Sequence, residues 1–437
     1  MAEASQAKSA GVTGRVAARI GRWTLVAGLG LLALASYVQG SSNALATYER
    51  GGSTDLHSYW GPGRALLAGH DPYADALGDE AYRTADGEGL AYSPAYAPLM
   101  LLVLSPLSAL SWQTARLLFL IANLATASLL PWVALRLSPT PIPRIAQWAV
   151  ALAFYGMLPT RAAISTGQPV LLTLMAALLG VALAARRPWV GGALIAVALT
   201  KWSLFLPALL WLAIEGAWLP IAVAVLAQPL AAVVIAVLAS VPLPRLLGGY
   251  SQLALVHLGL VGDLDVFSLE QRLGLAPSVP FLAATAVLLL TALLTMAAIR
   301  SGRAIDSTSP GGSAASLALL ALLVLAALPI GYHRIYDGVV VILLLIALLA
   351  ATFAWGSTLA NRLSRRRQRL VWSMVGVSMA LLLLPERAVS AIWPGWETAH
   401  AVGSLVSAMA AWCAAALIVW WQPRPELPAE VPAMLKP

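Results

Sequence analysis

Charged residues are scarce in this sequence of 437 residues. Only 11% of the residues are charged, 60% are hydrophobic, and the mean hydropathy is +0.80. Soluble domains carry roughly 25% charged residues, so this chain cannot cover itself with polar surface. The composition therefore excludes a set of soluble domains, a disordered chain, a collagen and a disulfide-stapled scaffold. It predicts a protein that lies mostly in a lipid bilayer.

Cysteine and lysine are nearly absent. The single cysteine, Cys413, excludes a disulfide within the chain and a cysteine-based metal site, and its apolar neighbours indicate a small buried side chain. Lys8 and Lys436 lie near the two ends, so Lys201 is the one lysine in the apolar part of the chain. Glycine-rich phosphate loops and the motifs of zinc proteases and serine hydrolases are also missing, which argues against a nucleotide substrate.

Twelve apolar runs account for the expected membrane crossings. A bilayer core of about 30 Å needs about 20 apolar residues in one helix. We expect crossings at 24–43, 113–135, 146–163, 169–185, 189–200, 203–214, 217–242, 278–299, 314–331, 338–356, 370–385 and 400–421. The predicted fold class is an all-α polytopic membrane protein with about twelve transmembrane helices.

The distribution of charge sets the expected orientation. Basic residues outnumber acidic ones in the segments placed inside, and the reverse holds outside, as the positive-inside rule requires. We expect cytoplasmic tails at 1–23 and 422–437 and an uncleaved first helix. The membrane domain then covers 24–421, and residues 44–112 form an external loop with interfacial helices. The net charge of +8 is mostly a result of this topology, and we expect no nucleic-acid partner.

Three short apolar runs decide the parity of the crossings. Residues 96–110 would form a helix of roughly 22 Å, too short to cross, so we expect them to lie at the external interface. A true crossing there, with a hairpin elsewhere, is the alternative. The runs 189–200 and 203–214 are also short, and we expect one out-and-back hairpin with Lys201 at its external tip.

This topology gathers polar side chains at five external tips. The tips are the first loop, the turn after the third crossing, the hairpin tip, the loop at 243–277 and the turn after the ninth crossing. Ionisable side chains near a membrane are costly and usually line a cavity, so we expect one external site. Its candidate residues are Asp55, Tyr59, Trp60, Arg64, Gln168, Lys201, His333, Arg334 and Asp337.

Each candidate also has a structural interpretation. A lysine beside a helix can snorkel to the interface, and an aspartate before a helix can cap it. Lys201 lies between two half-length helices, which favours a functional role. Asp55 shares a helical face with Tyr59, and a capping position would keep its carboxylate ionised. We expect the remaining loop acids to be solvated charges: Asp263, Asp265 and those of 75–88.

The first loop resembles a known family. The run Asp-Leu-His-Ser-Tyr-Trp-Gly-Pro-Gly-Arg-Ala-Leu-Leu-Ala-Gly-His-Asp-Pro-Tyr from Asp55 to Tyr73 resembles the first-loop signature of glycosyltransferase family 87. That family includes polyprenyl-phosphomannose-dependent mannosyltransferases. Further elements follow in the family's order, namely Tyr92-Ser-Pro94, Gly167-Gln168, Thr200-Lys201-Trp202 and the tip from Tyr332 to Asp337. Pro169 stands where the family commonly has Asn, and the Pro that often follows the lysine is missing.

The resemblance implies a GT-C fold and a hexosyltransferase of a bacterial plasma membrane. Such an enzyme passes a sugar, with mannose expected and glucose or arabinose as alternatives, from a polyprenyl-phosphate donor to a lipid or glycan acceptor on the external face. Asp55 would be the general base. The donor phosphate would be bound by Lys201, His333 and Arg334, and the sugar or acceptor by Tyr59, Trp60, Arg64, Gln168 and Asp337.

No cofactor is expected for this chemistry. The leaving polyprenyl phosphate is a stable anion that needs cations rather than a strong acid, so a metal is not required, although the acidic first loop does not exclude one. A transporter or flippase for a lipid-linked glycan is the alternative function, and a non-catalytic scaffold subunit is another. Transporters favour internal repeats and a site near the midplane, and this sequence has no evident repeat.

Overall fold

The computed structural model describes residues 2–49, 55–73, 96–258, 264–267, 273–274, 276, 278–300, 314–330, 333–355, 365–383 and 396–421. Within these ranges all regular structure is helical. Seven helices are long and apolar enough to cross a membrane, or eight if a bent pair is counted as one crossing. The chain is therefore an all-helical polytopic membrane protein, as its composition predicted.

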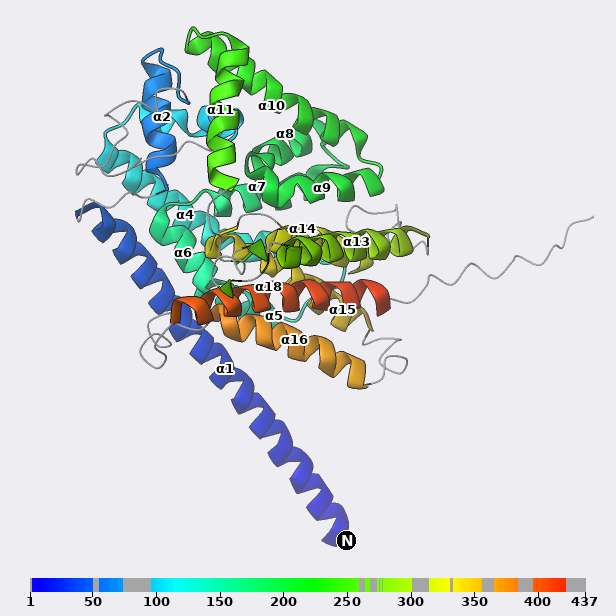
Figure 1. Cartoon of the computed structure of the whole chain (residues 1–437). Helices are drawn as coiled ribbons and strands as arrows, with labels where there is room; N and C mark the ends of the chain where they lie inside the picture. The colour runs from blue at the N-terminus through cyan, green and yellow to red at the C-terminus, as the bar shows by residue number, and fades with distance from the viewer. Residues whose placement is uncertain are drawn as a thin grey trace, which may run out of the picture.

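The helices pack into one bundle (Figure 1). The first half contains α1 (Ala2–Glu49), α2 (His57–Leu67), α3 (Pro98–Ser108), α4 (Trp112–Leu135), α5 (Arg144–Gly156), α6 (Leu158–Thr166), α7 (Val170–Leu183), α8 (Pro188–Ala198), η3 (Leu199–Lys201) and α9 (Trp202–Ile214). The second half contains α10 (Trp218–Leu238), α11 (Leu243–Leu258), α13 (Ser278–Arg300), α14 (Ala314–Ile330), η4 (Ile335–Val340), α15 (Val341–Trp355), α16 (Arg365–Leu383) and α18 (Trp396–Trp421).

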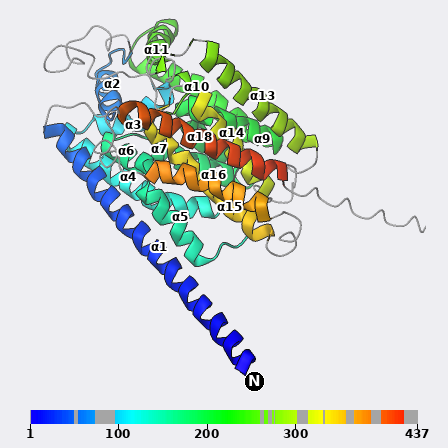
Figure 2. The same ribbon diagram turned by 60° about the horizontal axis from the view of Figure 1, so that its bottom comes forward.

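Helix α1 lies along one side of the bundle, and its N-terminal half extends beyond the other helices (Figures 1 and 2). Most of the expected N-terminal tail, 1–23, is thus part of this helix, whereas the expected C-terminal tail, 422–437, lies outside the described residues. α14 and α15 form the centre, since nearly every side chain of 316–329 and 337–351 is buried. Helices that are apolar on all sides belong in such a position.

Contacts of α1 show which helix ends lie together. Arg116 at the start of α4 donates to the carbonyl of Leu45 at the end of α1, at 3.2 Å, so the two helices run in opposite directions. The chain between them returns to the end of the bundle from which it left. α3, which contains 11 residues, is too short to cross. These observations agree with the prediction that residues 96–110 make no crossing.

The third predicted crossing consists of two helices that follow each other along α1. The backbone of Met157, with ψ at 140°, separates α5 from α6. Leu32 lies against Gly156, and Ile164 lies against Gly40. The later contact in α1 is also the later contact in the α5–α6 segment. α5 and α6 therefore run parallel to α1, and α6 ends beside its C-terminal part.

The apolar run of 27 residues from α8 to α9 is long enough for a single crossing, but the chain turns within it. At Lys201 the backbone leaves the helical region, with φ at −102° and ψ at 64°. α8 is parallel to α10, because Gly192 lies against Val223 and Gln228 donates to the carbonyl of Ala196 at 2.8 Å. Since α9 joins these two parallel helices, it must run back. The contacts therefore support the predicted hairpin with Lys201 at its tip.

Candidate functional site

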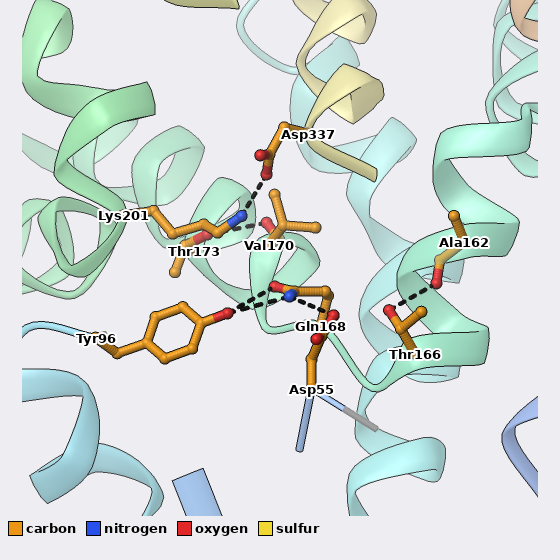
Figure 3. Close-up of polar contacts among 9 residues, drawn as sticks. All are labelled: Asp55, Tyr96, Ala162, Thr166, Gln168, Val170, Thr173, Lys201 and Asp337. Carbon is orange, nitrogen blue, oxygen red and sulfur yellow. Dashed lines mark hydrogen bonds and ion pairs between the residues drawn. The ribbon is translucent and has the colours of Figure 1, made fainter. Parts of the chain in front are cut away.

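The centre of the candidate site is a hydrogen bond between Asp55 and Gln168 (Figure 3). The Gln168 amide donates to Oδ2 of Asp55 at 2.5 Å. The backbone N–H of Asp55 donates to the carbonyl of Thr166 at 2.8 Å, which fixes the segment before α2 on the end of α6. Two candidates that lie 113 positions apart in the sequence therefore meet, as the prediction of a single site requires.

A glycine turn places Gln168. α6 ends at Gly167 in the left-handed conformation, with φ at 68° and ψ at 38°, a position that glycine fills at low cost. The chain then bends by 116° into α7. A Cβ on Gly167 would lie 3.2 Å from the Cβ of Leu56, so a side chain there would press on the segment that carries Asp55. Asn123 of α4 supports the turn by donating to the carbonyl of Gln168 at 3.1 Å.

Tyr96 is a member of the site that the sequence did not single out. Gln168 donates to the Tyr96 hydroxyl at 3.1 Å, and the Tyr96 ring packs on Tyr59 with 4.1 Å between ring centroids. Burial raises the pKa of both phenols, so both remain protonated. Tyr59 was predicted, but Tyr96 stands at the start of an apolar run and looked like part of an interfacial helix.

Lys201 and Asp337 form an ion pair beside Gln168 (Figure 3). Their side chains are only 11% and 6% exposed, respectively. The ammonium also lies over the ring of Tyr336, 4.8 Å from its centroid, a favourable position for a cation. Asp337 does not cap the helix that follows. It lies within η4, and its carboxylate faces the lysine.

Asp55 does not cap α2 either. The residue before α2 is Leu56, no side chain caps this helix, and the Asp55 carboxylate faces Gln168 instead. Burial is the largest influence on this carboxyl and raises its pKa above the ordinary range. The hydrogen bond from Gln168 and the charges of Lys201 and Arg334 oppose that shift. The expectation that a capping position holds the pKa down is thus wrong.

His333 and Arg334 lie at the same end but differ in exposure. His333 is buried, and its carbonyl accepts from the N–H of Leu264 at 3.1 Å, whereas Arg334 is exposed. The Arg334 charge nevertheless acts on Asp55. Asp265, predicted to be solvated, is 2% exposed because its segment packs on the end of α14. Asp263 and the acidic residues of 75–88 lie outside the described residues, as does Tyr92-Ser-Pro94.

Trp60 and Arg64 belong to a neighbouring group. The Arg64 guanidinium lies 5.0 Å from the Trp60 ring centroid, and the Trp60 indole donates to the carbonyl of Leu110 at 3.2 Å. Trp60 also meets Trp112, on which His57 stacks at 3.6 Å. Burial, followed by the Arg116 charge, lowers the pKa of His57 to about 4, so it is neutral at physiological pH.

A second buried carboxylate ties the first loop to α11. Asp71 accepts from the N–H of Tyr73 at 3.0 Å and pairs with Arg245 at 3.8 Å. The Tyr73 hydroxyl donates to the carbonyl of Tyr96 at 3.1 Å, and its ring packs on Tyr250 at 5.5 Å. Through the Tyr73 hydroxyl, this group holds the backbone of Tyr96 in place. In the described ranges, no three His, Cys, Asp or Glu side chains gather as metal ligands.

No protein-family model, no curated protein and no solved structure matches the chain.

Proposed function

We propose that the protein is an integral membrane glycosyltransferase with a GT-C-type arrangement of about twelve crossings. It transfers a hexose, with mannose as the first choice, from a polyprenyl-phosphate sugar to a lipid or glycan acceptor on the external face of a bacterial plasma membrane. The observation that carries this proposal is the meeting of Asp55, Gln168, Lys201 and Asp337 at one end of the bundle. The first-loop resemblance gives the reaction class.

Asp55 has the properties of a general base. Its Oδ2 is held by Gln168, which orients the carboxylate, and Oδ1 can accept the proton of an acceptor hydroxyl. Because burial raises its pKa, the carboxylate is a stronger base than a solvated aspartate, and the hydrogen bond from Gln168 and the charges of Lys201 and Arg334 favour its ionised form. A base with a pKa closer to the working pH is more effective.

The donor phosphate would be bound by three side chains, namely Lys201, Arg334 and the buried His333. The leaving polyprenyl phosphate gains negative charge as the glycosidic bond breaks, and cations fixed near that charge stabilise the transition state. Tyr59 is buried in the core, so of the two stacked rings it is the half-buried Tyr96 that would meet a sugar face. Trp60 and Arg64 belong to the neighbouring group on α2, and we assign them to the acceptor.

The direct test is transfer by the purified protein. Radiolabelled polyprenyl-phosphate mannose, glucose and arabinose are offered with lipid extract as the acceptor. Labelled product and free polyprenyl phosphate support the proposal. A transporter would instead move the labelled lipid across a vesicle membrane without cleaving it, and a scaffold would do neither.

The orientation of the protein in the membrane can be tested by cysteine labelling. Ser138 lies near Thr140, which donates to Ala350 at the far end of α15, whereas Ser165 lies on α6 at the site. In a Cys413→Ala background, we expect Ser165→Cys to react with an impermeant maleimide on intact cells and Ser138→Cys to be protected. The reverse pattern would place the site in the cytoplasm and overturn the external assignment.

The pH dependence gives a further prediction. The base works only when ionised, so kcat/KM falls as the pH drops through the raised pKa of Asp55, and we expect this acid limb above the ordinary aspartate range of about 4. Gln168→Met removes the hydrogen bond that favours the carboxylate while still filling the space, so the limb should move to higher pH. An unmoved limb in this variant would assign the titration to another group.

A further inference from the structure

The cation that the donor phosphate needs is already paired with an anion of the protein itself. Lys201 contacts Asp337, and both side chains are almost fully buried. Among the described residues at this site, two acidic side chains, Asp55 and Asp337, accompany two basic ones, Lys201 and Arg334. A site built only to hold an anion would have no need of a carboxylate beside its lysine.

Asp337 is also held in place. It lies in η4, between the two central helices α14 and α15. The next residue, Gly338, packs so closely on α6 that a Cβ there would lie 3.0 Å from Cγ of Pro159. The Asp337 backbone N–H donates to the carbonyl of Arg334 at 2.9 Å. The carboxylate therefore stays beside Lys201 when a second anion arrives.

The charge of the ligand changes during the proposed reaction. The acceptor oxygen bonds to the anomeric carbon, the bond from that carbon to the phosphate oxygen breaks with its electron pair going to the phosphate, and the hydroxyl proton goes to Asp55. The donor is a phosphodiester with one negative charge. The product is a phosphomonoester with a charge of about −1.5 to −2 at pH 7. If the phosphate binds at Lys201, as proposed, the added charge arises close to Asp337.

We infer that Asp337 discriminates between donor and product and drives the release of the lipid phosphomonoester. This inference rests on the proposed function, because its ligand is the product of that reaction. The single charge of the donor shares Lys201 with Asp337, whereas the extra charge of the product is repelled by the fixed carboxylate. Asp337 is thus a specificity-determining residue rather than a sugar-binding one.

The test measures binding rather than turnover. Polyprenyl phosphate, its methyl diester, neutral polyprenol and inorganic phosphate are titrated into the detergent-solubilised full chain at pH 8. Wild-type protein should bind the diester more tightly than the monoester. Asp337→Asn, which keeps the shape but removes the charge, should bind the monoester at least tenfold more tightly than wild type does, with polyprenol unchanged. Glu215→Gln removes a carboxylate at the opposite end of α9 from Lys201, where it accepts a hydrogen bond from Ser316, and should leave all four affinities unchanged.

Several results would overturn the inference. They are a wild-type preference for the monoester, which needs no variant to observe, an Asp337→Asn variant with unchanged or weaker monoester binding, and inorganic phosphate that binds as tightly as the lipid. The proposed function fails separately. If wild type transfers no sugar but Asp337→Asn gains affinity for the monoester, the discrimination stands and the transferase assignment falls.

Discussion

Asp55→Asn should reduce turnover by a factor of about 10² to 10⁴, the usual cost of removing a general base. The substitution keeps the size of the side chain, and an asparagine oxygen can still accept the hydrogen bond from Gln168. It removes the carboxylate charge and with it the ability to take the acceptor proton. We therefore expect kcat to fall while the affinity for the polyprenyl-phosphate sugar is not weakened.

The stability of this variant separates chemistry from folding. Because burial raises the pKa of Asp55, its ionised form at neutral pH is destabilising in the folded protein. The neutral asparagine should leave the thermal unfolding temperature unchanged or slightly higher. Glu215→Gln is the control, since it makes the corresponding change at a carboxylate that accepts a hydrogen bond from Ser316 at the end of α9 remote from the site. If Asp55→Asn keeps more than about a tenth of wild-type turnover, Asp55 is not the base.

The lengths of the apolar runs and the distribution of charge between the two sides of the membrane were sufficient to predict the coarse fold. They predicted an all-helical membrane protein, and the described residues are helical. Seven or eight helices there are long enough to cross, against the twelve crossings expected. The contacts of α4 and α10 agree with an α3 too short to cross and with a chain that turns back at Lys201. The break between α5 and α6 could not be predicted in this way. It depends on one residue, Met157, whose extended backbone leaves no mark on hydropathy.

The sequence could not predict which polar side chains contact each other. Asp55 and Gln168 could be named as candidates from their tips, but their hydrogen bond depends on how Gly167 turns the chain toward Leu56. Asp337 looked like a helix cap because aspartate is favoured there, and only packing of η4 against α6 brings it to Lys201. The spacing of residues along the chain cannot predict such pairs, because it does not show which external loops and turns lie together in the folded protein.

Lys201→Gln should reduce kcat/KM for the donor by about 10² to 10³, the effect typical of losing one group that stabilises transition-state charge. It should also destabilise the protein, because it leaves the Asp337 carboxylate buried without its cation. Breaking a buried ion pair from one side costs about 3–5 kcal/mol. A loss of activity in this variant alone would therefore not separate phosphate binding from a structural ion pair.

The double variant Lys201→Gln with Asp337→Asn makes that separation. It removes both charges, and replacing a whole buried pair is often nearly neutral for stability, so its unfolding temperature should return toward the wild-type value. Its kcat/KM should not return, because the phosphate has lost its nearest cation. Unfolding is followed by intrinsic fluorescence, and kcat/KM by radiolabelled transfer. If the double variant recovers transfer to within tenfold of wild type, Lys201 serves only to neutralise Asp337, and the donor phosphate is bound by Arg334 and His333 instead.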